Sequence, residues 1–230
     1  MEEKSAISQK YMLLISSSIF LMTFVYYAIG RYLVNSKLTY YQYLVFVSVL
    51  AIVVVGGYQI FFWVQRNNFF FKTRCLKIRM DDYIPFVPQF VWLYSFSYYL
   101  LIGLVVASIN SIEQGINFIF GGLLLLVFQS ICFLVFPCTV PSHWRKYKVN
   151  TLSIRFLKFV QGLDNGRNCF PSMHCSVATY VGLLLMPLMS YYSLILIAFV
   201  SISCLFVKQH QVVDILPGIL LGCLVYALIL

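Results

Sequence analysis

The sequence predicts an all-α fold, a polytopic bundle of about six to seven transmembrane helices. Two observations carry this prediction. Hydrophobic residues make up 61% of the 230 positions and charged residues only 10%, whereas a soluble domain averages roughly 45–50% apolar and about 25% charged residues. The chain also contains several apolar runs close to the ~20 residues that a helix needs to cross a bilayer. The same composition excludes a disordered chain and a disulfide-stapled secreted module.

Seven apolar runs meet or approach this length, and they cover residues 11–34, 43–64, 88–109, 116–136, 174–189, 191–207 and 212–230. The first run is too long for the apolar core of a signal peptide, so it predicts a span. Only a short turn around Ser190 separates the fifth run from the sixth. No charge falls in the middle of any run, and Asp214 lies near the start of the last one.

Basic residues dominate the charge of the chain. Sixteen Lys and Arg against seven Asp and Glu give a net charge of +9, which indicates an anionic partner such as lipid headgroups or phosphate. Nucleic acid is not favoured as a partner, because the basic residues lie in short loops between apolar runs. Loops 65–88 and 137–171 hold most of them, and Phe69, Phe70 and Phe71 in the first loop favour a segment lying in the membrane interface.

Seven spans would place both basic loops, the amino terminus and the junction of the last two runs on one side of the membrane. Few charges remain on the other side. The positive-inside rule then assigns the basic side to the cytoplasm.

All three histidines, His143, His174 and His210, map to this basic side. His174 lies where loop 137–171 meets the fifth run, and His210 lies where the sixth run turns into the seventh. His210 and Asp214 are four positions apart, which puts them on one face of a helix. The Asp214 carboxylate is expected to accept the Nδ1 proton of His210 and leave Nε2 free as a nucleophile. These residues predict an active site at the membrane surface.

A phosphate-binding role is expected for several residues around these histidines. Ser172 is a favourable N-cap, and the N–H groups that follow it would form an anion site. His174 in that turn is placed to donate a proton to a leaving oxygen. Lys208, Arg145 and Arg167 are candidates to neutralise phosphate oxygens. Simple helix capping by Ser172, and headgroup contact by the basic residues, remain the alternatives.

Neither a metal nor a cofactor is predicted. Two histidines and one carboxylate also suit a metal site, but the neighbouring Lys and Arg side chains would repel a cation. The seven cysteines form no CxxC pair or zinc-type cluster, so unpaired structural thiols are expected. No pattern indicates an oligomeric state.

The motifs Pro171-Ser172-Met173-His174 and His210-x3-Asp214 resemble the second and third motifs of the membrane-bound type 2 phosphatidic acid phosphatase superfamily. Residues 164–174, 82–88 and 208–210 are similar to the branch shared with inositol phosphorylceramide synthases and related bacterial proteins. The resemblance covers roughly residues 80–230. It implies a phosphatase-like catalytic helix bundle at 80–230. The apolar runs and the basic loop before it predict a transmembrane hairpin and basic interfacial loop at 1–79.

The resemblance implies a catalytic role for each of the three motif residues. His210 would attack phosphorus and form a phosphohistidine, with Asp214 orienting it. His174 would protonate the departing oxygen and then activate the acceptor. No metal takes part in this chemistry.

Two family features have only approximate counterparts. The family places Arg six residues before the histidine of its third motif, where this chain has Cys204, and Lys208 is the nearest replacement. The basic first motif is represented at best by Pro141 and the residues after it, which adds Lys146 to Arg145 as an expected phosphate ligand.

The function that follows is an integral membrane lipid phosphate phosphatase, acting on a phosphomonoester or pyrophosphate of a phospholipid, sphingolipid or isoprenoid lipid. The first alternative is a phosphotransferase that moves a headgroup phosphoryl to a hydroxyl acceptor, as in inositol phosphorylceramide or sphingomyelin synthesis. The second is a non-enzymatic lipid transporter that uses the same polar patch. The resemblance implies an extracytoplasmic or lumenal catalytic face, opposite to the side that the charge count indicates.

Overall fold

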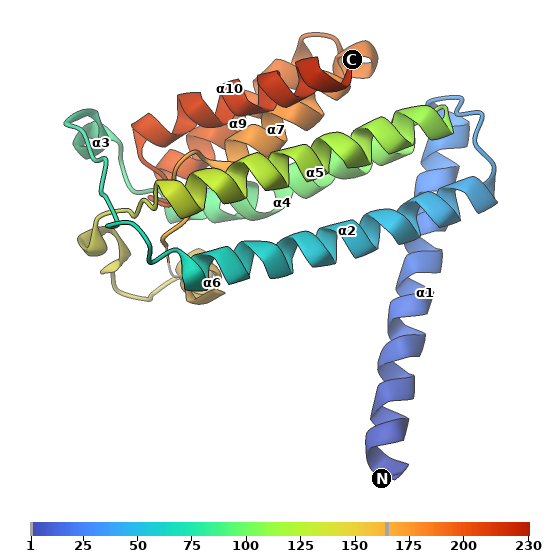
Figure 1. Ribbon diagram of the computed structural model, residues 1–230, viewed down its shortest axis with the longest axis horizontal. Helices are drawn as coiled ribbons and strands as arrows, with labels where there is room; N and C mark the ends of the chain where they lie inside the picture. Colours follow the sequence, from blue (N-terminus) through green and yellow to red (C-terminus); the bar gives the residue numbers. More distant parts are fainter. Residues whose placement is uncertain (1, 164–165) are drawn as a thin grey trace.

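A computed structural model describes residues 2–163 and 166–230, with side chains from residue 14 onward except that of residue 98. Within these residues the chain is mainly helical, and the strand-like pairing consists of two isolated bridges that join residues 74, 138 and 168. The all-α prediction is confirmed (Figure 1). Asp164 and Asn165, which begin the family-like stretch 164–174, lie outside the described residues.

The long helices are α1 (Glu2–Leu33), α2 (Tyr40–Asn67), α4 (Val91–Ser108), α5 (Ile112–Val135), α7 (Met173–Leu184), α9 (Tyr192–Phe206) and α10 (Val212–Ile229). The shorter elements are α3 (Met80–Tyr83), α6 (Leu152–Leu163), α8 (Met186–Met189) and the 3-10 turns η1 (Pro88–Phe90) and η2 (Ser142–Arg145).

Five helices in the described part of the chain are long and apolar enough to cross a membrane: Leu14–Leu33, Tyr40–Asn67, Pro88–Ser108, Ile112–Val135 and Val212–Ile229. The apolar helices α7 and α9 are shorter. Together they are the helices of a multi-pass membrane protein, as the apolar runs predict.

Helix α2 begins at a capping box, in which the Thr39 hydroxyl accepts from the Gln42 N–H and the Gln42 side chain accepts from the Thr39 N–H. Helix α5 begins at Ser111, whose hydroxyl accepts from the Gln114 N–H. Both helices run toward the end of the bundle at which α10 begins (Figure 1). These caps satisfy backbone donors that no residue within the helix can pair.

Helices α2, α4, α5, α7, α9 and α10 lie alongside one another, whereas α1 crosses them at a steep angle (Figure 1). The carboxyl-terminal end of α1 is attached to the bundle, because the Ser36 hydroxyl just after it donates to the Ile109 carbonyl at 2.6 Å. The bundle therefore consists mainly of α2 and the helices after it, with α1 joined to it at one end.

Helix α10 packs closely against α7 because two glycines face it. A Cβ atom at Gly218 would lie 2.6 Å from the Ser172 carbonyl oxygen, and one at Gly222 would lie 2.5 Å from that of Ser176. Both separations are shorter than van der Waals contact. This approach brings the first turn of α10, with Asp214, to the amino terminus of α7.

Loop 137–171 has more structure than its polar composition suggests. It contains η2 and the amphipathic helix α6, which buries Ile154, Leu157 and Gln161 on one face. The fifth apolar run is also divided, since α7 ends at Leu184 and α8 follows before a residue with positive φ, Ser190.

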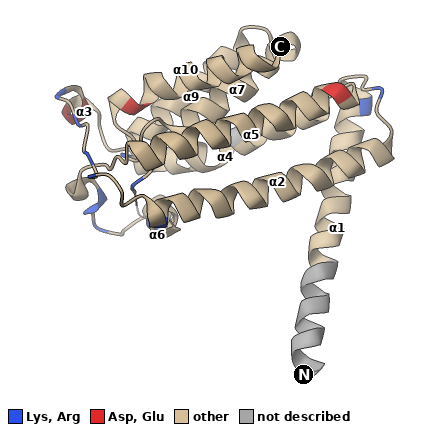
Figure 2. Ribbon diagram, viewed as in Figure 1, with Lys and Arg blue, Asp and Glu red and all other residues tan. Residues whose placement is uncertain are grey.

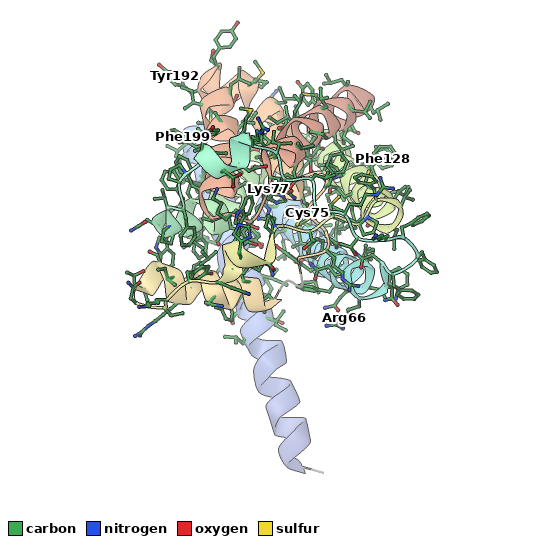
Figure 3. All side chains as sticks on the ribbon, turned by 90° about the vertical axis from the view of Figure 1, so that its left-hand side faces the viewer. Arg66, Cys75, Lys77, Phe128, Tyr192 and Phe199 are labelled. Carbon is green, nitrogen blue, oxygen red and sulfur yellow. The ribbon has the colours of Figure 1, made fainter. Side chains whose placement is uncertain are left out.

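Basic residues gather where α2, α5 and α9 end and α4, α7 and α10 begin (Figure 2). Arg31 near the end of α1, Lys37 just after it and Glu113 in the first turn of α5 belong to the opposite end. Figure 3 faces the basic end, where Cys75 and Lys77 lie near the middle. The side chains of Phe128, Phe199 and Tyr192 lie around the margin of this view. All the residues of the expected site belong to this end.

Candidate active site

His174 and His210 lie side by side at the basic end of the bundle. His174 is in the first turn of α7, and His210 is in the turn that joins α9 to α10. Their ring centroids are 5.9 Å apart and the rings are inclined at 65°. The His210 side chain is buried and that of His174 is half-buried. Two imidazoles from segments far apart in the sequence therefore face a common space.

Two acceptors orient the His210 ring. Its Nδ1 atom lies 3.0 Å from the Cys169 carbonyl oxygen and 3.4 Å from Oδ2 of Asp214. A carbonyl oxygen only accepts hydrogen bonds, so the neutral ring carries its proton on Nδ1 and its lone pair on Nε2. From the sequence, Asp214 alone was expected as the acceptor, and the Cys169 carbonyl is nearer.

Asp214 is fully buried and connects the two motifs. Its Oδ2 also accepts from the N–H of Gln211, the N-cap residue of α10, at 2.8 Å. Its backbone carbonyl accepts from the Ser172 N–H at 3.0 Å. The Gln211 side chain donates in turn to the Thr139 carbonyl at 3.1 Å. The carboxylate is thus held against His210 by the same contacts that start α10.

Two neighbours of the histidines were not anticipated as parts of the site. The Tyr94 ring of α4 stacks on His174, with centroids 4.0 Å apart and an interplanar angle of 24°. The Cys204 sulfur of α9 and one nitrogen from each of His174 and His210 all lie within 4.8 Å of one another. No sequence pattern predicts that Tyr94 stacks on His174. Cys204 could have been identified, because it occupies the position where the family has Arg.

Ser172 is fully buried and acts as the N-cap of α7, its hydroxyl accepting from the Cys175 N–H at 3.3 Å. Helix capping, the alternative stated for this residue from the sequence, therefore accounts for the position of its oxygen. The other N–H groups in the first turn of α7 remain potential anion donors beside His174.

Lys208 is buried just before His210. Its ammonium donates to the Asp81 carbonyl at 2.7 Å and lies 4.6 Å from the centre of the Trp144 ring. Burial lowers the pKa of Lys208, and the carboxylates of Asp81 and Asp82 oppose that shift. The Lys208 ammonium is therefore bound to protein groups, and these contacts hold the turn that leads to His210 in place.

The three other basic residues expected to bind phosphate differ in their placement. Arg145 is half-buried, with Nη2 3.5 Å from Oε1 of Gln209, next to His210. A Cβ atom at Gly166 would lie 2.5 Å from the same Nη2 atom. Arg167 and Lys146 are exposed. Arg145 is the basic residue of this group that packs against the turn containing His210.

Asp81 is a buried acid whose role the sequence did not reveal. Its Oδ1 accepts from the Val212 N–H at 2.9 Å, and its Oδ2 accepts from the Ile78 N–H at 2.8 Å. With the Lys208 contact, one residue of loop 65–88 holds both ends of the turn that contains His210. The only available signal was a pair of acids, Asp81 and Asp82, within a basic loop.

An apolar cavity of about 210 Å³ lies between α2, α4, α5 and α7. Its wall includes Gly57, Tyr99, Gly122 and Gln129, and it reaches Met173, the residue before His174. The Gln129 amide within the wall donates to the Ser176 hydroxyl at 2.7 Å. The cavity therefore extends from the amino terminus of α7 into the membrane-spanning part of the bundle.

A comparison with protein families identifies the chain. The family model of the PAP2 superfamily matches residues 62–228, which is well over half of the sequence. The chain belongs to the PAP2 superfamily. The predicted membership is confirmed, and with it a place in a family of phosphatase-type lipid enzymes. No curated protein and no solved structure gives a significant match.

Proposed function

We propose that this PAP2 superfamily protein hydrolyses a phosphomonoester or pyrophosphate of a membrane lipid through a phosphohistidine on His210. The orientation of that residue carries the proposal. The Cys169 carbonyl and Asp214 lie at Nδ1, which makes Nε2 the nitrogen that carries the lone pair, and the His174 ring lies beside that of His210. One imidazole is thus set as a nucleophile and the other as an acid and base.

In the first step, Nε2 of His210 attacks phosphorus, and the bond from phosphorus to the lipid oxygen breaks. The imidazolium of His174 gives its proton to that oxygen as it leaves. Bound phosphate favours the protonated form of His174, because it brings negative charge to a half-buried ring. The positive charge that develops on His210 is stabilised by Asp214.

In the second step, His174 takes a proton from water, and the water oxygen attacks phosphorus as the bond to Nε2 breaks. Inorganic phosphate leaves and both histidines return to their starting states. The first-turn N–H groups of α7 and the Arg145 guanidinium are the nearest candidates to bind the phosphoryl oxygens. A metal is not required at any point of this sequence.

The apolar cavity supports a lipid as the substrate. It begins at Met173 and continues between membrane-spanning helices, so a hydrocarbon tail placed there has its phosphate near His174. Burial of apolar surface at roughly 25 cal/mol per Å² favours such a tail over water in the cavity. Phospholipid, sphingolipid and isoprenoid phosphates all carry a tail of this kind.

The experiment uses the purified full chain in detergent with EDTA and ³²P-labelled lipid phosphates and pyrophosphates. We expect release of free phosphate and, after rapid quenching, labelled protein whose label is stable in alkali and lost in acid, as a phosphohistidine requires. His210→Gln should give neither product nor label, whereas His174→Gln should slow both the formation and the loss of the label, because His174 acts in both steps. Label that persists in His210→Gln, or activity that EDTA abolishes, would contradict the proposal.

A second candidate function is transfer of the phosphoryl group to a lipid hydroxyl. The similarity of residues 82–88 and 164–174 to the synthase-related branch favours it. The same assay separates the two functions, because a phosphotransferase releases product only when a hydroxyl acceptor is added.

A further inference from the structure

A group of three metal-binding side chains lies inside the site. The ligand atoms of His174, Cys204 and His210 are all within 4.8 Å of one another. They come from α7, α9 and the turn between α9 and α10, so the packing of the bundle brings them together. Cys204 is fully buried, His210 is buried and His174 is half-buried.

We propose that His174, Cys204 and His210 form a binding site for Zn²⁺, and that the bound ion inhibits the enzyme. The binding itself is independent of the activity of the protein. The inhibition rests on the function proposed above, because it requires His210 to be the nucleophile.

The donor atoms suit zinc better than a hard cation. Two imidazole nitrogens and one thiolate are typical zinc ligands, and a fourth position remains for water or substrate. Zn–N distances of about 2.0–2.1 Å and Zn–S distances of about 2.3 Å place tetrahedral ligands roughly 3.3–3.6 Å apart. Atoms now within 4.8 Å of one another would need to approach by little more than ~1 Å, which side-chain rotation can supply.

The surroundings also resemble those of a bound metal. The Nδ1–H of His210 is directed at the Cys169 carbonyl with the Asp214 carboxylate beside it, which is how a metal-ligating histidine is commonly oriented. The Lys208 ammonium binds the Asp81 carbonyl instead of facing the cluster. On binding, the Cys204 thiol transfers its proton to water and the thiolate joins the ion.

The residue at position 204 decides whether the site favours phosphate or a metal ion. A guanidinium at this position would bind phosphate and repel a divalent cation. The Cys204 thiol carries no positive charge, so it does not repel the cation, and it does not bind phosphate. Zinc on Nε2 of His210 would occupy the lone pair that attacks phosphorus. The ion should therefore compete with phosphoryl transfer, and its removal should restore activity.

The first test measures binding without any substrate. Purified full-length protein in detergent is titrated with Co²⁺, whose thiolate charge-transfer and tetrahedral d–d absorption bands report the ligands directly. We expect both bands in the wild type, loss of the charge-transfer band in Cys204→Ser, and no change in Cys223→Ser, an exposed cysteine of α10. Absence of the bands from the wild type, or a charge-transfer band that survives in Cys204→Ser, would overturn the proposal, so the wild-type titration decides even if the variant does not fold.

The second test measures inhibition of lipid phosphate hydrolysis by Zn²⁺. EDTA should reverse the inhibition, and Cys204→Ser should raise the inhibitory concentration by at least about tenfold, since loss of even an indirect metal contact costs about 10–100-fold in affinity. If EDTA abolishes activity and Zn²⁺ restores it, the ion is a cofactor and the inhibitory proposal is wrong. If no hydrolysis is found while the cobalt bands appear, the proposed function fails and the binding site stands.

Discussion

The carboxylate of Asp81 accepts a hydrogen bond of 2.9 Å from the backbone N–H of Val212, a residue 131 positions later in the chain. Val212 is the first residue of α10 and comes just after the turn that holds His210. The carbonyl of Asp81 binds the Lys208 ammonium on the other side of the same turn. Asp81 therefore holds the turn that contains His210 through its neighbours, and under the proposed mechanism it acts as a positioning residue.

Replacing Asp81 by Ala should lower kcat by about 10–100-fold and change KM little, because His210 is then less precisely aligned and substrate contacts remain. Asp81→Asn, which retains an acceptor, should recover part of the loss. Asp82→Ala is the matched control, since Asp82 is exposed and pairs with Lys77. Steady-state kinetics on a lipid phosphate in detergent would measure both constants. An equal loss in the Asp81→Ala and Asp82→Ala variants would contradict the positioning role.

Asp214→Asn should reduce kcat by at least about 100-fold, a typical effect of removing one preorganised electrostatic group from a transition state. The variant keeps an oxygen that can accept from the Gln211 N–H, so α10 should still form. It loses the negative charge that stabilises the His210 imidazolium. Rapid-quench measurement of the phosphoenzyme should show slower formation. Formation at the wild-type rate would show that Asp214 acts only as a helix cap.

The three basic residues Arg145, Arg167 and Lys146 should differ in how strongly their replacement lowers kcat/KM. Arg145→Leu should lower kcat/KM by about 10–100-fold, because hydrogen bonds to charged groups contribute about 1.5–3 kcal/mol. Arg167→Leu and Lys146→Leu, at exposed positions, should change kcat/KM by no more than about twofold to threefold. Parallel assays at fixed ionic strength test the order. A larger effect at Arg167 than at Arg145 would contradict this order and would indicate that the phosphate binds beside the exposed Arg167.

A side chain added to the apolar cavity should select against long lipid tails. A Cβ atom at Gly122 meets nothing within 4 Å, and Gly122 lines the cavity. Gly122→Leu should therefore reduce kcat/KM for a long-chain lipid phosphate and leave that for a short-chain analogue unchanged. Gly56→Leu is the control, because the space around Gly56 is equally open but Gly56 is not part of the cavity wall. Equal losses for both chain lengths would exclude the cavity as the tail site.

The sequence predicted the apolar helices and the two histidine motifs because both depend on local patterns. Apolar runs of membrane-spanning length locate most of the helices. A spacing of four residues brings His210 and Asp214 together because it corresponds to about one turn of a helix. The amphipathic helix α6 was missed, although Ile154 and Leu157 have helical spacing, because the polar composition of loop 137–171 obscured it.

The rest of the site depends on contacts between distant segments. The Cys169 carbonyl that orients His210, the Tyr94 ring on His174 and the Asp81 carboxylate on α10 come from three different regions. A backbone carbonyl carries no residue signature, and stacking partners are set by how α4 packs on α7. Such pairings become visible only when the helices are placed in space.

The contact between α7 and α10 should be sensitive to a single methyl group. A Cβ atom at Gly222 would lie 2.5 Å from the Ser176 carbonyl oxygen, and backbone cannot move aside without separating the helices that carry His174 and Asp214. Gly222→Ala should lower the free energy of unfolding by about 1–3 kcal/mol, as overpacking of a close contact does. Gly162→Ala in α6 is the control, because its Cβ meets no neighbour within 4 Å and alanine favours a helix by up to ~1 kcal/mol over glycine. Thermal unfolding in detergent should give a lower Tm for Gly222→Ala and an equal or higher Tm for Gly162→Ala. An unchanged Tm for Gly222→Ala would mean that α7 and α10 are not in direct backbone contact, and the link from Asp214 to Ser172 would lose its support.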